Sequence, residues 1–114
     1  MSDEQAIYEN DPLPQRVRKP FNGLSDAELE RLAILAEEAA EVVQVVGKIL
    51  WHGYESCHPH RPEQGTNRQH LEEEIGNFAH MVDRMIAKGD VDEGMILASS
   101  TEKARTIGQY LHHQ

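Results

Sequence analysis

The 114-residue chain has little of what several classes of protein need. Its single cysteine, Cys57, excludes an intramolecular disulfide and suits a reducing cytoplasm. No apolar run is long enough for a signal peptide or a transmembrane helix. Positive charge is also scarce, with 11 Lys and Arg against 20 Asp and Glu and a net charge of -9. We therefore expect a soluble cytoplasmic protein that binds neither a nucleic-acid polymer nor an anionic membrane.

Proline divides the chain into two parts. Three of the five prolines lie in residues 1–23, which should form an extended N-terminal arm. Residues 24–114 have the length of one domain with a modest core. Helical periodicity without strand alternation predicts an all-α helical bundle of about three main helices. Because three helices bury little, we expect a homodimer or homotetramer to complete the core.

Capping patterns indicate where the helices begin and end. Ser25 and Glu28 have the spacing of a capping box, and Gly89 is a typical C-terminal stop. The expected helices run from Ser25 to Trp51, from Thr66 or Asn67 to Gly89, and from a capping box at Asp90–Glu93 toward Tyr110. Their predicted inward positions are Leu32, Leu35, Ala39, Val42, Val46, Ile49 and Leu50, then Leu71, Ile75, Phe78, Val82, Met85 and Ile86, then Ile96, Leu97, Ala104, Ile107 and Leu111.

Two short polar pairs lie beside these apolar stripes. Glu38 and Glu41 are three residues apart on the first helix, and Glu74 and Asn77 have the same spacing on the second. Residues three apart lie on one face of a helix, so each pair can direct its oxygens to one point. Carboxylates gathered near a core need a cation or protons to neutralise them, and Mg²⁺ prefers oxygen ligands. The pairs are therefore interpreted as two halves of a divalent-metal site.

The segments Leu35–Glu41 and Glu73–Asn77 resemble the E-x-x-E and E-x-x-D elements of the MazG-like all-α nucleoside triphosphate pyrophosphohydrolases. The resemblance covers roughly residues 24–86. It implies Mg²⁺-dependent cleavage of an NTP or dNTP between the α- and β-phosphates. By match to the motif, Glu38, Glu41 and Glu74 are catalytic residues and, with Asn77, metal ligands, one of which also orients or deprotonates water.

Asn77 departs from the family pattern, which has Asp at this position. The amide keeps a carbonyl oxygen but removes one negative charge, so metal affinity should fall. Three outcomes are open: a weaker but active site, which we favour, compensation by Glu73 or Asp83, or nucleotide binding without efficient turnover.

Further side chains are candidates for substrate binding. Lys48 lies two turns beyond Glu41 on nearly the same face, and Arg84 is similarly placed relative to Asn77. Aromatic rings can stack on a base. Surface ion pairing and core packing are the competing interpretations. The substrate-binding candidates are Lys48, Trp51, Phe21, Arg84 and Lys103.

Other functions are compatible with parts of the sequence. A phosphoribosyl-ATP pyrophosphohydrolase would share the helical fold and the acidic site, and a non-catalytic helical dimer could bind nucleotide without cleaving it. The long loop and its flanks also carry residue types that bind zinc or nickel, although their spacing matches no firm template. These residues are His52, Cys57, His58, His60 and His70.

Overall fold

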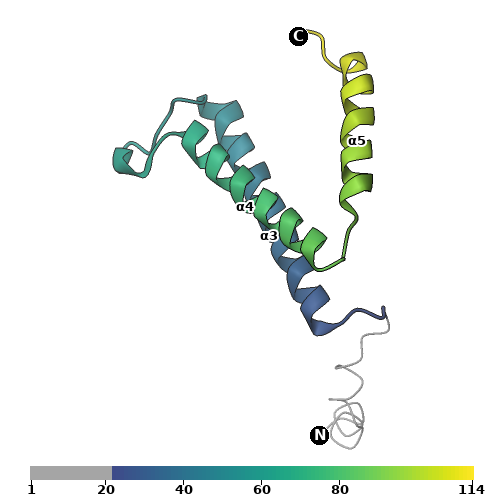
Figure 1. The fold of residues 1–114 in the computed structure, drawn as a ribbon. Coiled ribbons are helices and arrows are strands. Elements are labelled where there is room, and N and C mark those ends of the chain that lie inside the picture. Colours follow the sequence, from purple (N-terminus) through teal and green to yellow (C-terminus); the bar gives the residue numbers. More distant parts are fainter. Residues whose placement is uncertain (1–21) are drawn as a thin grey trace, which may run out of the picture. The chain divides into compact units, whose positions relative to one another are not determined.

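The part of the chain that the structure describes is mainly helical. A computed structural model describes residues 22–114. Its elements are three α-helices, α3 (Asp26–His52), α4 (Asn67–Ala87) and α5 (Glu93–Thr106), and two short 3-10 helices, η1 (Pro62–Gln64) and η2 (Ile107–Gln109) (Figure 1). Within this range the only β-type pairing is an isolated bridge between Cys57 and Thr66. The all-α prediction is confirmed for these residues, whereas the predicted arm lies almost wholly outside them.

The first two helices begin at the predicted caps. The Ser25 hydroxyl accepts a hydrogen bond from the Glu28 backbone N–H at 3.1 Å, and the Glu28 carboxylate accepts one from Ser25 N–H at 3.0 Å. Thr66 and Gln69 form the same reciprocal pair at the start of α4. Each box satisfies backbone donors that have no partner inside the helix, which fixes where the helix begins.

The stop after α4 is a Schellman motif. Gly89 has a φ of +80°, a conformation that glycine adopts without steric cost. Its N–H donates to the Ile86 carbonyl at 3.0 Å, and Asp90 N–H donates to the Met85 carbonyl at 2.9 Å. The predicted stop at Gly89 is confirmed, because these two bonds satisfy the last carbonyls of the helix.

The predicted cap of the third helix is wrong. Asp92, not Asp90, caps α5, since its Oδ2 accepts the Met95 N–H at 2.9 Å. Asp90 instead pairs with Arg31 near the start of α3, with Nη2 to Oδ1 at 2.9 Å and Nε to Oδ2 at 2.5 Å. The guanidinium holds the pKa of the Asp90 carboxyl below its usual value. The Asp90 side chain therefore links the residues after α4 to α3 and does not cap α5.

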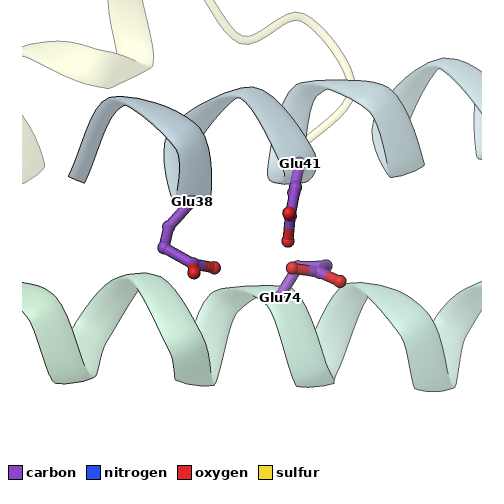
Figure 2. Close-up of side chains that lie close together, drawn as sticks. All are labelled: Glu38, Glu41 and Glu74. Atoms are coloured by element: carbon purple, nitrogen blue, oxygen red, sulfur yellow. The ribbon is translucent and has the colours of Figure 1, made fainter. Parts of the chain in front are cut away.

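Helices α3 and α4 form an antiparallel hairpin that is fastened near both ends. At the end next to the loop, the buried side chain of Asn67 donates from Nδ2 to the Gly53 carbonyl at 3.1 Å. At the opposite end the Arg31–Asp90 pair joins the start of α3 to the residues just after α4. Figure 2 shows the two helices side by side around Glu38, Glu41 and Glu74.

The hairpin encloses a small core. Its buried apolar side chains are Val45, Met81 and Met85. Val45 and Met81 were not among the predicted inward positions, whereas Leu50 and Ile75 were and are exposed. Both helices carry two neighbouring apolar faces, and the positions predicted to point inward combined residues from both faces. Only one face of each helix packs within the chain.

Helix α5 exposes its apolar side chains in the single chain. Four of the five positions predicted to point inward are exposed, and only Ile107 is partly buried. The exposed four are Ile96, Leu97, Ala104 and Leu111. None of the helices in residues 22–114 combines the length and apolar character needed to cross a bilayer.

Candidate metal centre

Three carboxylates meet between α3 and α4. Glu38 and Glu41 extend from successive turns of α3, and Glu74 reaches toward them from α4 (Figure 2). One oxygen from each of the three lies within 4.8 Å of the other two. All three side chains are half-buried. Because the spacing of three keeps the α3 pair on one face, antiparallel packing places Glu74 opposite both.

The cluster holds a proton near neutral pH. Several effects together raise the pKa of Glu41 from 4.5 to about 7, and the largest is a hydrogen bond between the Glu41 and Glu74 side chains. The other contributions, in decreasing order, are the negative charge of Glu74, burial, and the charges of Glu38 and Glu37. Two carboxyl groups can share a hydrogen bond only if one is protonated, so Glu41 retains its proton where an exposed glutamate has lost it.

Two oxygens of the cluster are buried without a hydrogen-bond donor. They are Glu38 Oε2 and Glu74 Oε2. Buried polar atoms are normally paired, and carboxylate oxygens from two helices facing one point match the ligand preference of a hard divalent cation. The donor set therefore fits Mg²⁺, which would supply the charge and the contacts that the protein does not provide there.

The raised pKa of Glu41 has a consequence for stability. The folded state holds this proton up to about pH 7, whereas an unfolded glutamate releases it near 4.5. The stabilising contribution is therefore complete below about pH 4.5 and is lost as pH rises through about 7. We expect the difference in Tm between wild type and Glu41→Gln, both measured in chelator, to decrease as pH rises from about 4.5 to about 7. Excess Mg²⁺ should restore the lost stability, with the largest gain above pH 7.

Thermal denaturation monitored by circular dichroism at a series of pH values measures this difference. Subtracting the Glu41→Gln profile removes the contributions of other titrating groups that the two proteins share. A difference that stays constant across the window would show that Glu41 does not titrate as the cluster geometry requires.

The remaining predicted residues lie outside the group of three carboxylates. Asn77 is exposed on the turn of α4 that follows Glu74. Lys48 is exposed on α3, and Trp51 is 82% exposed. Arg84 Nε lies 3.4 Å from His80 Nε2, Lys103 Nζ lies 5.8 Å from the Tyr110 ring, and Phe21 lies outside the described residues.

The histidines and the cysteine do not assemble into a second centre. Within residues 22–114, the three glutamates are the only group of three or more His, Cys, Asp or Glu residues close enough to share an ion. His58 Nδ1 accepts the His60 backbone N–H at 3.1 Å, and His70 Nε2 lies 2.8 Å from the Gln64 carbonyl. The rings of His58, in the loop, and His70, on α4, thus bond to the loop backbone.

Comparisons with protein-family models, with curated proteins and with solved structures gave no match. The acidic cluster and the motif resemblance are therefore the only indications of function. Two features were not predicted from sequence: the hydrogen bond between Glu41 and Glu74 and, outside the metal centre, a cavity at the loop end of the hairpin. Both depend on contacts between residues far apart in the chain, which helical periodicity does not encode.

Proposed function

We propose that this protein is a Mg²⁺-dependent nucleoside triphosphate pyrophosphohydrolase of the MazG-like all-α family. It would cleave an NTP or dNTP to the monophosphate and pyrophosphate. The observation that carries the proposal is the convergence of Glu38, Glu41 and Glu74 from two antiparallel helices to within 4.8 Å. The segments containing these residues also resemble the family motif, so geometry and motif both point to the three glutamates, although not to the fourth motif position, Asn77.

The protein's own groups have distinct tasks in this proposal. Glu38, Glu41 and Glu74 would hold the cation, and the two orphan oxygens would gain a partner. Bound Mg²⁺ supplies electrostatic stabilisation of charge developing on phosphate and lowers the pKa of a coordinated water. Glu41 must release its proton to become a full ligand, so cation binding and deprotonation should occur together.

Substrate contacts would come from side chains outside the cluster. Lys48 lies seven residues beyond Glu41, about 10 Å along the helix axis, and its ammonium can neutralise a phosphate. Trp51 presents a largely exposed ring on which a base can stack. Arg84 and Lys103 are exposed cations. They would contact a phosphate group only if the bound substrate reaches them or if a second subunit places its substrate beside them.

A second subunit is part of the proposal. Besides its face toward α4, α3 carries an apolar strip composed of Leu32, Val43, Val46 and Leu50, all exposed in the single chain. Their spacing keeps them within about 60° around the helix. A strip of this kind is typical of helices that pack on another subunit. We propose that a second copy of the chain covers it, giving a homodimer or a homotetramer.

A substrate panel tests the function. Purified full-length protein with Mg²⁺ and each common NTP and dNTP should release pyrophosphate, detected as phosphate after coupled pyrophosphatase treatment. Phosphoribosyl-ATP is included, because turnover of that compound alone would identify the alternative pyrophosphohydrolase. Failure of the whole panel, with nucleotide binding retained, would support a non-catalytic nucleotide-binding dimer and refute the enzyme proposal.

Asn77→Asp should tighten the metal requirement. The substitution restores the carboxylate of the family pattern on the turn after Glu74, and another negative ligand strengthens binding of a hard cation. We expect half-maximal activity at a several-fold lower Mg²⁺ concentration, measured by titrating Mg²⁺ at fixed nucleotide. Asp83→Asn, which removes an exposed carboxylate further along α4, tests the compensation hypothesis in the same assay. An unchanged or weaker Mg²⁺ requirement in Asn77→Asp would exclude residue 77 as a ligand.

A further inference from the structure

A cavity of about 520 Å³ lies at the loop end of the hairpin, where α3 ends and α4 begins. Its walls include Lys48 and His52 from the last turns of α3, Ser56 and His58 from the loop, and His70 from the first turns of α4. The volume is within the range of small-molecule sites. The cavity does not include the three glutamates of the metal centre.

The chemistry of the walls is unusual for this chain. Acidic residues outnumber Lys and Arg by 20 to 11, yet no Asp or Glu lines the cavity. Its lining includes one ammonium and three imidazoles, and the ion pairs within residues 22–114 leave Lys48 unused. Focused positive charge and hydrogen-bond donors favour an anion. We propose that this cavity binds the phosphate group of a small phosphorylated molecule, without a metal ion.

Hydrogen bonds hold the loop in place around the cavity. Ser56 O accepts the Asn67 N–H at 2.9 Å, and the Cys57–Thr66 bridge pairs the two ends of the loop. Because His58 Nδ1 accepts the His60 N–H, the proton of the neutral ring resides on Nε2, which is then a donor. A loop fixed in this way loses little entropy when a ligand binds.

The donors for the anion must be side chains. The first backbone amides of α4 are already used, since Asn67 N–H and Arg68 N–H donate to the carbonyls of Ser56 and Tyr54. The helix start therefore contributes its dipole but no free N–H group. Lys48 supplies the full charge, and Ser56, His52 and His58 supply directional donors, whereas the N–H of His70 is used by the Gln64 carbonyl. Lys48 is consequently the residue whose loss should matter most.

Phosphate binding in chelator provides the test, because this inference does not depend on the proposed hydrolysis. Inorganic phosphate, and then a nucleoside monophosphate against its nucleoside, are titrated into ¹⁵N-labelled full-length protein in EDTA at constant ionic strength. We expect shifts in amide resonances around the cavity, including Ser56 and His70, and none around Glu38 and Glu74. The nucleoside alone should produce no such shifts.

Lys48→Met should weaken phosphate binding about tenfold or more, which corresponds to the loss of a charge-assisted hydrogen bond. Lys48→Arg should retain most of the affinity and shows that the position tolerates change. Lys88→Met removes the same charge from an exposed position after α4 and should bind like wild type. No phosphate-dependent shifts, or equal affinity in Lys48→Met and wild type, would overturn the proposal even if pyrophosphate release is observed.

Discussion

Glu41→Gln should abolish Mg²⁺-dependent pyrophosphate release and at the same time raise the Tm of the chelated protein at pH 8. The amide removes a metal ligand and a negative charge but keeps the size of the side chain. Loss of even an outer-shell partner of a metal site costs about 10- to 100-fold, so we expect kcat/KM to fall at least about 100-fold. Stability should move the other way, because the repulsion from Glu38 and Glu74 that raises the pKa of Glu41 disappears.

The opposite signs make this variant informative. A loss of activity caused by misfolding would come with a lower Tm, whereas a loss of metal binding comes with a higher one. Mg²⁺ should raise the Tm of wild type and leave that of Glu41→Gln nearly unchanged. Glu30→Gln, at an exposed position on α3 outside the cluster, should match wild type in every assay. Full activity in Glu41→Gln would eliminate the acidic cluster as the catalytic centre.

Val43→Glu should convert the assembled protein to a monomer. Val43 is 70% exposed in the single chain and lies within the apolar strip on α3. A carboxylate buried there in a subunit interface would lose its hydration without gaining a partner, which is costly. Light scattering coupled to size-exclusion chromatography should give a multiple of the chain mass for wild type and the mass of one chain for the variant.

Gln44→Glu is the matched control for assembly. It introduces the same charge at the adjacent exposed residue, which points about 100° away from Val43 around the helix. We expect it to assemble like wild type. If wild type is already a monomer at micromolar concentration, or if Val43→Glu assembles normally, the strip on α3 is not the contact between subunits. Circular dichroism of Val43→Glu verifies that its helices are intact.

The sequence predicted features that depend on local chemistry. The helix caps and the stop after α4 act through hydrogen bonds that span only a few residues. The ends formed by Ser25 with Glu28, Thr66 with Gln69, and Gly89 could therefore be predicted from the sequence. The spacing of Glu38 and Glu41 likewise placed both carboxylates on one side of α3. Glu74 meets them because the two helices pack antiparallel, the usual outcome for a hairpin, in the register that sets residue 74 opposite residues 38 and 41.

Features that depend on residues far apart in the chain could not be predicted from the sequence. Asp90 and Asp92 are both reasonable helix caps, and the choice between them is made by Arg31, 59 residues earlier in the chain. Similarly, Met81 and Ile75 lie on adjacent faces of α4, and only packing against α3 decides which is buried. Periodicity identifies that apolar faces exist, but it cannot rank two faces of similar hydrophobicity.

The fastenings at the two ends of the hairpin limit how its middle can respond to charge. Asn67 fixes the loop end through the Gly53 carbonyl, and Arg31 with Asp90 fixes the other, so the helices resist spreading apart where the carboxylates meet. Repulsion that cannot be relieved by separation has to be relieved by uptake of a positive charge. If the proposed cation binds, it would compete with the proton on Glu41 for one position between the three carboxylates.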